Sequence, residues 1–359
     1  MSPAGSTRAE LGIGLVGCGR VSTLHLDAAS GVRGARLVAA TDLVTERAER
    51  AAARYGAATC GSVEELVSRD DVDLVVVATP SGTHAELGAL AARAGRHVLV
   101  EKPMDVDPAA ARQLVTVCHE RAVTLSVISQ HRFDPGTVRL KTAIDELEID
   151  PVVLAEGRVW WYRDEDYYRA DSWRGTRALD GGALMNQGIH TLDLLRWLLG
   201  PATSISAHAT TALHAIEMED TLTATIRFAR GTLATLAVTT AAAPGQAETL
   251  SFAGPQGTYR LESGTLVVHP ADGPSPTTRA DNSHETPEPT AARGSTDLAA
   301  TAHRAQLQDV VDAIRTARPP AVTGEDGLAA VELVTAAYRS ARLGQQVTPS
   351  DTPDSPTST

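Results

Sequence analysis

Short apolar runs alternate with amphipathic stretches along the first third of the chain. The runs consist mostly of Val, Leu, Ile and Ala, and between them apolar residues recur every three or four positions. This alternation is typical of a parallel sheet with crossover helices on both faces. We therefore predict a doubly wound α/β domain of five or six strands over residues 1–128. The predicted strands are Leu11–Val16, Ala35–Thr41, Val72–Ala78, His97–Val100 and Val123–Ile128, and the predicted helices include Thr45–Tyr55, Thr83–Ala94 and Pro108–Arg121.

After Gln130 the pattern changes to longer runs in which apolar and polar residues alternate, separated by glycine and proline clusters. Alternation with a period of two predicts half-buried strands of a mainly antiparallel sheet. These strands are Val152–Tyr162, Thr221–Phe228, Thr232–Thr239 and Glu248–Phe252. A helix from about Ala183 to Leu199 interrupts them, between a Gly-Gly and a Gly-Pro pair. Residues 129–348 are thus predicted to form an α+β domain with an open sheet, closed by helices at Leu298–Thr316 and Gly324–Leu343.

Two segments have a composition that disfavours a packed core. Residues Pro270–Thr296 are rich in Pro, Ser, Thr and Asp, which predicts a long mobile loop, and residues 349–359 are expected to form a disordered tail. The chain as a whole is 43% apolar over 359 residues, which is sufficient for a sizeable core.

Charge and cysteine content argue against several classes of protein. The net charge is -12 without a basic block, so the long-range field repels nucleic acids and anionic membranes. The first ten residues lack an apolar signal and no run reaches the length of a membrane span, so a cytoplasmic protein is expected. Cys18, Cys60 and Cys118 are odd in number and widely spaced, which predicts core thiols; no metal site is predicted.

A glycine-rich turn follows the first predicted strand. Gly17-Cys18-Gly19-Arg20-Val21-Ser22 has the spacing G-x-G-x-x-small and opens a helix, where glycines let a pyrophosphate approach the backbone N–H groups. Asp42 ends the second strand, where its carboxylate can accept hydrogen bonds from a ribose diol. Leu43 follows it, which favours NAD over NADP, although Arg47 nearby keeps NADP possible. The alternative is a glycine turn that serves packing alone, or a doubly wound domain that binds another ligand.

Lys102 is one of only two lysines among 32 cationic residues, and it follows the apolar run that ends at Val100. In a chain so biased toward arginine, a lysine indicates a need for a compact ammonium whose pKa can shift. Glu101-Lys102-Pro103 is therefore a candidate catalytic segment, the alternative being a surface lysine at a strand end. Thr79 and Pro80 leave the third strand at the same edge of the sheet and are predicted to flank the nicotinamide. His84 is predicted to begin the next helix beside this cofactor site.

The helix that begins near Ala183 carries a second set of candidate groups. Asn186, His190 and Asp193 are spaced i, i+4 and i+7, so an α-helix places them on one stripe that can face a cleft. An imidazole beside a carboxylate can accept a hydroxyl proton near neutral pH, with the carboxylate orienting it. The alternative is a structural histidine bonded to a neighbouring loop.

Aromatic residues make up 4% of the chain but gather in one segment, which holds all four tryptophans. Flat rings interleaved with arginines suit a polyhydroxylated ring, and they equally suit an oligomer interface. The residues predicted to shape a sugar site are Arg132, Tyr162, Arg163, Trp173 and Asn186.

Together, these segments resemble the glucose–fructose oxidoreductase/inositol dehydrogenase (Gfo/Idh/MocA) family. The resemblance runs from the glycine turn through Ala78-Thr79-Pro80 and Glu101-Lys102-Pro103 to Gly188–Asp193 and Tyr338-Arg339-Ser340. It implies a Rossmann domain followed by an open sheet that packs on another subunit, giving a homodimer or homotetramer. It also implies that Lys102 and His190 lie at the nicotinamide and the substrate carbinol. The residue four before this histidine is often aspartate in the family, whereas here it is Asn186, which cannot exchange a proton.

These observations predict an NAD(P)-dependent dehydrogenase that oxidises a secondary hydroxyl of a sugar, a sugar derivative such as a nucleotide-linked sugar, or a cyclitol. Three alternatives remain open. The first is an NADPH-dependent ketosugar reductase in deoxysugar or aminosugar formation. The second is an enzyme that uses tightly bound NAD for transient oxidation and then cleaves a glycosidic bond. The third is a nucleotide-sensing regulator without catalysis, against which the presence of both Lys102 and His190 argues.

Overall fold

The computed structural model describes residues 10–273 and 291–349, which divide into two compact units. Within the described residues, unit 1 takes residues 10–133, 177–181 and 296–331, and unit 2 takes residues 134–176, 182–273, 291–295 and 332–349. Most of the predicted long loop and nearly all of the predicted tail, residues 274–290 and 350–359, lie outside the described residues. No helix in the described part of the chain is long and apolar enough to cross a membrane.

Unit 1 is built on a parallel sheet of six strands in the order β3-β2-β1-β4-β5-β6. All residues of β1 and β4 are buried, as expected for central strands covered on both faces. The strand order reverses between β1 and β4, the point at which doubly wound sheets bind ligands. The strands are β1 Leu11–Val16, β2 Ala35–Thr41, β3 Ala58–Thr59, β4 Leu74–Val77, β5 His97–Val100 and β6 Leu125–Val127.

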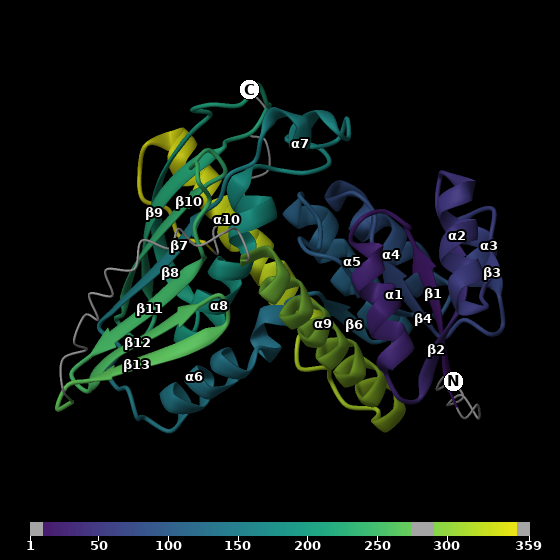
Figure 1. The fold of residues 1–359 in the computed structure, drawn as a ribbon, viewed down its shortest axis with the longest axis horizontal. Helices are drawn as coiled ribbons and strands as arrows, with labels where there is room; N and C mark the ends of the chain where they lie inside the picture. Colours follow the sequence, from purple (N-terminus) through teal and green to yellow (C-terminus); the bar gives the residue numbers. More distant parts are fainter. Residues whose placement is uncertain (1–9, 274–290, 350–359) are drawn as a thin grey trace. The chain divides into compact units, whose positions relative to one another are not determined.

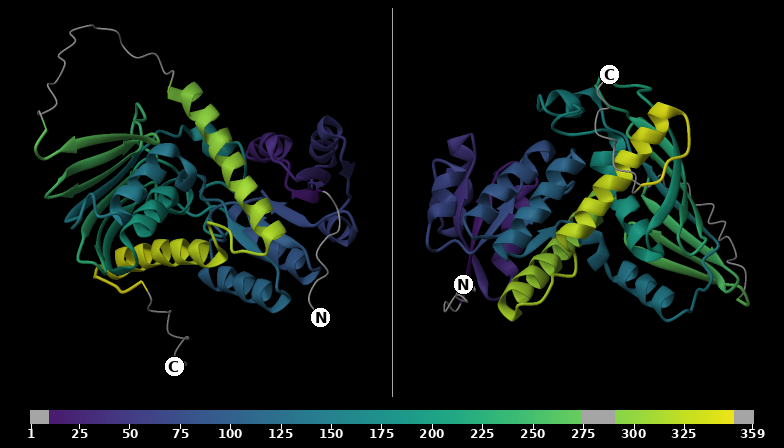
Figure 2. Two further views of the ribbon diagram at one scale, coloured as in Figure 1. Left: turned by 90° about the horizontal axis from the view of Figure 1, so that it is seen from below. Right: turned by 180° about the vertical axis from the view of Figure 1, so that it is seen from behind.

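Helices connect these strands and cover the sheet (Figure 1). They are α1 Ser22–Gly31, α2 Thr45–Tyr55, α3 Val63–Ser68, α4 His84–Arg93 and α5 Pro108–Arg121, with short turns η1 Ser81–Thr83 and η2 Gln130–Phe133. The Asp107 side chain caps α5 by accepting the Ala109 N–H, and a proline occupies its first turn, which suits a helix start. The long helix α9, Ala291–Thr316 (Figure 2), adds Leu307, Val310 and Val311 to the core around β1.

Unit 2 contains a sheet of seven strands in the order β13-β12-β11-β7-β10-β9-β8. Only the β7–β10 pair is parallel among these strands, so the sheet is mainly antiparallel, as predicted. The strands are β7 Leu154–Trp160, β8 Ala202–Thr210, β9 Thr221–Phe228, β10 Leu233–Thr239, β11 Thr249–Gly254, β12 Gly257–Glu262 and β13 Thr265–Pro270.

One face of this sheet is buried and the other is open. In β9, Leu222, Ala224 and Ile226 are buried while Thr223 and Thr225 between them are exposed, the alternation expected of a sheet covered on one side. The buried face packs against helix α8, whose Thr191 and Leu195 contact the position of Gly157 in β7. The unit also contains α6 Pro135–Asp145, α7 Glu165–Arg169, α8 Ile189–Leu199 and most of α10 Gly324–Leu343.

Strands β1, β2, β5 and β9 and helices α2, α5 and α10 have the bounds predicted from the pattern. The pattern missed β3, β8, β12 and β13, which are short, lie at or beside sheet edges, or contain many polar residues. The helix predicted at Leu298 begins at Ala291 instead. The helix predicted from Ala183 opens with five residues of π-helix, Leu184–Gly188, before α8 continues it, a departure that side-chain periodicity does not reveal.

Candidate functional site

The glycine turn in unit 1 joins β1 to α1. Gly17 has φ +90°, and a Cβ there would lie 2.6 Å from the Ala78 carbonyl oxygen, so only glycine fits. At Gly19 no atom lies within 4 Å of the position of a Cβ. Val21, at the start of α1, gives the helix no side-chain cap, and its first turn contains no acidic residue. This open turn beside an uncapped helix N-terminus fits the pyrophosphate of a dinucleotide.

Asp42 ties this turn to the end of β2. Its Oδ2 accepts the Cys18 N–H at 2.7 Å, and its Oδ1 accepts the Val44 N–H at 2.7 Å. Each oxygen keeps a second lone pair, so the carboxylate can brace the turn and still accept from a ribose. Burial, reinforced by the charge of Asp42, raises the pKa of the Cys18 thiol to about 12, so this thiol stays protonated.

Replacing Asp42 with Asn is expected to weaken NAD binding about 10-fold, because one anionic acceptor becomes an amide that faces an N–H donor. The affinity for NADP should fall less, since the substitution also removes a negative charge that repels a 2′-phosphate. Isothermal titration with both nucleotides measures the change. Glu46→Gln, an exposed loss of the same charge on α2, is the control. An unchanged NAD affinity in the Asp42 variant would exclude a role for this carboxylate.

His84 braces two loops that leave the carboxyl edge of the sheet. Its Nδ1 lies 2.7 Å from the carbonyl oxygen of Pro103, and its Nε2 lies 2.8 Å from that of Thr79. The residue is 1% exposed and begins α4, as the sequence predicted. Both ring nitrogens are thus engaged with backbone oxygens, so the side chain holds the Thr79-Pro80 loop to the loop after β5.

The backbone of Lys102 is held by its buried neighbour Glu101. The Glu101 Oε2 accepts the Lys102 N–H at 3.1 Å, and its Oε1 lies 2.7 Å from His25 Nε2 on α1. His303 Nε2 on α9 is 3.8 Å from the same oxygen. Burial opposes the charge of Glu101, but hydrogen bonding and attraction from the two imidazoles keep its pKa well below the usual value. An ionised carboxylate therefore fixes the segment that presents the Lys102 side chain.

These three groups are also the set within the described residues with donors spaced for a metal ion. The ligand atoms of His25, Glu101 and His303 lie within 4.8 Å of one another. The direct contact between His25 and Glu101 already pairs their polar atoms, and the second carboxylate oxygen is bonded to the backbone. We assign the cluster a structural role, as an anchor for the Glu101-Lys102 segment.

In unit 2 four consecutive backbone N–H groups, those of residues 182–185 where the π-helix begins, are bonded by Glu219 and Tyr338. Glu219 accepts from Ala183 through its carbonyl at 2.9 Å and from Leu184 through Oε1 at 2.8 Å. The Tyr338 hydroxyl accepts from Met185 at 3.2 Å and Gly182 at 3.4 Å. Helix starts normally leave such groups for caps or water. Two side chains distant in sequence therefore determine where this helix begins.

The carboxyl of Glu219, which accepts a backbone N–H at the start of the π-helix, is buried. Its Oε1 also accepts the Tyr338 O–H at 3.0 Å, whereas its Oε2 has no hydrogen-bond partner among the described residues. Burial, with a smaller contribution from the charge of Asp220, raises the pKa of Glu219 to about 7. Removal from water and the charge of Glu219 raise the pKa of Tyr338 well above its usual value. A Cβ on Gly182 would lie 1.7 Å from the Glu219 Oε2, so this glycine makes room for the carboxyl.

Asn186 and His190 are the two partly exposed side chains in residues 181–195, all of which the structure describes. Asp193 is 3% exposed and does not share their exposure, although an ideal α-helix was expected to align all three. The π-turn accounts for the difference, because it changes the angular spacing between residues 186 and 193. π-Helical turns occur frequently at functional sites.

The remaining predicted residues lie in both units. Arg132 is in unit 1, 4% exposed, with its Nη1 3.4 Å from the Asp326 carboxylate. Tyr162 is exposed and Trp173 half-buried in unit 2. Arg20 is exposed in the glycine turn. The candidate groups of each unit are brought together within that unit: the glycine turn with Asp42, Thr79 with Pro103, and Glu219 with the helix that bears Asn186 and His190.

Sequence reasoning missed Glu219, His25 and the role of Tyr338. The only signal for Glu219 is a Glu-Asp pair immediately before a predicted strand, and Tyr338 stands in a motif whose role the pattern does not explain. Their roles arise from contacts between residues distant in sequence, 76 positions apart for His25 and Glu101 and 119 for Glu219 and Tyr338.

Comparison with known proteins identifies both halves of the chain. Residues 11–129 match the model described as "Oxidoreductase family, NAD-binding Rossmann fold", and residues 137–260 match "GFO/IDH/MocA C-terminal domain". Inositol 2-dehydrogenase of Rhizobium meliloti is 29% identical over 93% of this chain and 98% of its own. D-apiose dehydrogenase of Paraburkholderia graminis is 30% identical over 93% and 88%.

A solved structure with the same fold is the WlbA dehydrogenase from Bordetella pertussis, in complex with NADH and UDP-GlcNAcA. It is 32% identical, covers 96% of this chain and 99% of its own, and superposes with a TM-score of 0.85. Unit 1 is accordingly an NAD-binding Rossmann domain, and the chain is a member of the Gfo/Idh/MocA family of oxidoreductases.

Proposed function

We propose that this protein is an NAD-dependent dehydrogenase that oxidises a secondary hydroxyl of a sugar, a sugar derivative or a cyclitol. One observation carries the proposal: along residues 181–195, only Asn186 and His190 reach the surface of an otherwise buried helix. A hydrogen-bonding amide and an imidazole, one turn apart, suit the recognition and deprotonation of a hydroxyl. The names of the relatives, which act on inositol and D-apiose, support a polyol substrate.

The side chains divide the work as follows. The bound nicotinamide supplies the acceptor for the hydride. The Lys102 ammonium binds the reacting oxygen and stabilises its developing negative charge, while Glu101 holds the backbone of Lys102 in place. His190 accepts the hydroxyl proton, and Asn186 holds a neighbouring hydroxyl without exchanging a proton. Asp193, a buried acidic residue on the same helix, is proposed to orient His190.

NAD is proposed over NADP. Asp42 places a carboxylate where the ribose hydroxyls of the cofactor are expected, and a 2′-phosphate there would be repelled. Leu43 beside it is fully exposed and offers no positive charge. Tyr162 and Trp173 are proposed to border the sugar.

The open face of the unit 2 sheet is proposed to join subunits into a homodimer or homotetramer. Register places Leu154 opposite Leu233 on this face, and both side chains are about half exposed. Exposed aliphatic side chains on a broad sheet are typical of surfaces that associate.

A panel of sugars, nucleotide sugars and cyclitols, each offered with NAD or NADP, tests the function. Reduced nicotinamide is expected to form with one class of polyol and with NAD in preference to NADP. A protein that binds NAD but reduces it with no member of the panel would contradict the dehydrogenase. Product formation without net NADH would favour transient oxidation by bound NAD.

A further inference from the structure

Three arginines in unit 2 stack on aromatic rings between β7 and Gly175. The guanidinium carbon of Arg163 lies 5.2 Å from the ring centre of Trp161 and 5.0 Å from that of Tyr167. Arg174 stacks on Tyr167 at 4.2 Å and on Trp173 at 4.7 Å, and Arg158 lies 4.8 Å from Trp160. Stacking occupies the faces of a guanidinium and leaves its N–H edge for oxygen acceptors.

Arg163 differs from its neighbours in charge pairing. Arg174 donates to Asp171 at 3.0 Å, and Arg169 pairs with Glu165. Arg163 has no acidic partner among the described residues, and its Nε is buried without an acceptor. Because Nε is enclosed by protein, an acceptor from a ligand has to approach the terminal Nη groups of Arg163, whose positive charge no acidic group in the described residues offsets.

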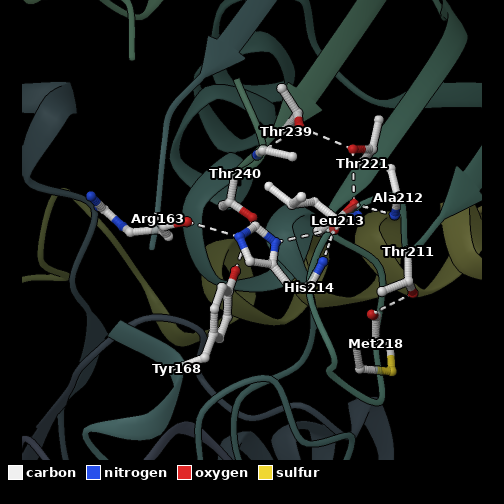
Figure 3. A network of polar contacts seen from close by, with 12 residues as sticks. Arg163, Tyr168, Thr211, Ala212, Leu213, His214, Met218, Thr221, Thr239 and Thr240 are labelled. Carbon is white, nitrogen blue, oxygen red and sulfur yellow. Dashed lines mark hydrogen bonds and ion pairs between the residues drawn. The ribbon is translucent and has the colours of Figure 1, made fainter. Parts of the chain in front are cut away.

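The backbone of Arg163 is held in place by a polar network (Figure 3). Its N–H donates to the Thr240 carbonyl at 2.8 Å, and its carbonyl lies 2.8 Å from His214 Nε2. His214 in turn contacts Asp220 through Nδ1 at 3.1 Å. Figure 3 shows the Arg163 side chain extending away from His214, so the network fixes the backbone and leaves the guanidinium to act elsewhere.

Asp220 is the ionised centre of this network. Its two oxygens accept the backbone N–H groups of Ala212, Leu213 and His214 and the hydroxyl of Thr221. Burial opposes its charge, but these hydrogen bonds keep the pKa of Asp220 below its usual value. The charge is satisfied locally by the network, so it does not neutralise the Arg163 guanidinium.

The arginine also lies beside the helix proposed to bind substrate. The Tyr167 hydroxyl, on a ring that stacks on Arg163, lies 3.3 Å from the amide nitrogen of Gln187. Gln187 is the neighbour of Asn186 in the π-helix. Arg158 also has a buried Nε without an acceptor, but it lies within the strand β7 and stacks on Trp160.

From these contacts we propose that the substrate carries an oxyanion group, a carboxylate or a phosphate, and that Arg163 binds it on the platform of Trp161 and Tyr167. This inference rests on the proposed dehydrogenase function and narrows its substrate class from sugars, sugar derivatives and cyclitols in general to those that carry an oxyanion. A planar guanidinium with its faces stacked is preorganised for two parallel hydrogen bonds to such a group, whereas a neutral hydroxyl uses only one of them.

The test compares three forms of one hexose: with a neutral hydroxymethyl group, with a carboxylate, and with a phosphate. Each is offered without a nucleotide, so that the group under test is the only oxyanion on the sugar. Binding to the NAD-loaded full-length protein is measured by calorimetry, so that catalysis is not needed for a signal. At least one anionic form is expected to bind 10-fold or more tightly than the neutral form, and the carboxylate and phosphate arms show which oxyanion is preferred.

Arg163→Gln is expected to remove this preference, with anionic binding weakened about 30-fold and neutral binding changed less than about 3-fold. Arg163→Lys should restore part of it, because the charge remains without the planar fork. Arg169→Gln is the matched control: it removes the same charge from an exposed arginine that pairs with Glu165, and it should leave binding unchanged. NAD affinity and thermal stability confirm that each variant is folded.

Equal binding of neutral and anionic forms, an equal loss for both in Arg163→Gln, or no binding that depends on Arg163 would overturn the inference. These outcomes are separate from the proposed function. Hydride transfer from a neutral polyol with unaltered Arg163→Gln kinetics would keep the dehydrogenase and remove the anion site. If anions bind in a way that depends on Arg163 but no form donates a hydride, the anion site stands and the dehydrogenase function is contradicted.

Discussion

Lys102→Ala is expected to lower kcat by at least about 1,000-fold, a loss of about 4 kcal/mol of transition-state stabilisation. The substitution removes the ammonium proposed to stabilise the developing alkoxide. It leaves the backbone anchor intact, because Glu101 accepts the backbone N–H of residue 102 and contacts His25 independently of the lysine side chain. NAD affinity is therefore expected to change less than about 3-fold.

Stopped-flow measurement of the first turnover and titration with NAD separate these two effects. Lys141→Ala provides the matched control, since Lys141 is the second of the two lysines in the chain and pairs with Asp145 on α6. That variant should keep the rate of hydride transfer. A Lys102 variant with undiminished kcat would exclude the proposed mechanism, and a parallel loss of NAD binding would indicate a role in the cofactor site instead.

Glu219→Gln is expected to change how stability depends on pH. The pKa of Glu219 is about 7 in the folded protein against 4.5 for an ordinary glutamate, so the folded state retains a proton that the unfolded state releases. The stability that this carboxyl contributes is present below pH 4.5 and is lost as pH rises to about 7. Between pH 5 and pH 8 the free energy of unfolding of the wild-type protein should fall by about 2–3 kcal/mol relative to that of the glutamine variant, whose side chain does not titrate.

Urea unfolding at both pH values, followed by circular dichroism, measures this difference. Glutamine preserves the Oε1 acceptor for Leu184 and Tyr338, so the start of the π-helix should persist. Glu217→Gln, at an exposed position two residues earlier, controls for the loss of one charge. Its free energy of unfolding should change with pH as that of the wild type does. If the free energy of unfolding of Glu219→Gln changes between pH 5 and pH 8 as much as that of the wild type, the carboxyl of Glu219 does not titrate in this range.

The two predictions concern one residue proposed to contact the substrate and one residue that holds a helix in place. Lys102 is proposed to act on the reacting oxygen, whereas Glu219 acts through the backbone of the helix that carries Asn186 and His190. The absence of an aspartate at position 186 leaves His190 as the proposed proton acceptor on that helix. We therefore propose that the buried carboxyl of Glu219 positions this helix and does not itself react.

The sequence alone determined the parallel domain and the order of its parts. Local patterns carry this information, because a buried strand is a continuous apolar run and the adjoining turn requires glycine at a fixed spacing. The strands β1, β2 and β5, the position of Asp42 after β2, and Lys102 after β5 all follow from such short-range patterns. The rarity of lysine and the helical spacing made Lys102 and His190 candidates, and the family resemblance implied that they lie at the nicotinamide and the substrate carbinol.

Only the tertiary structure decided what holds these candidates in place. His84 bridges carbonyls of two separate loops, His25 reaches Glu101 across 76 residues, and Tyr338 reaches Glu219 across 119. The π-turn was likewise visible only in the structure, since hydrophobic periodicity cannot distinguish it from an α-turn. A sequence pattern indicates whether a residue faces the core or the solvent. The hydrogen-bond partner of a buried polar group is instead fixed by how distant segments pack.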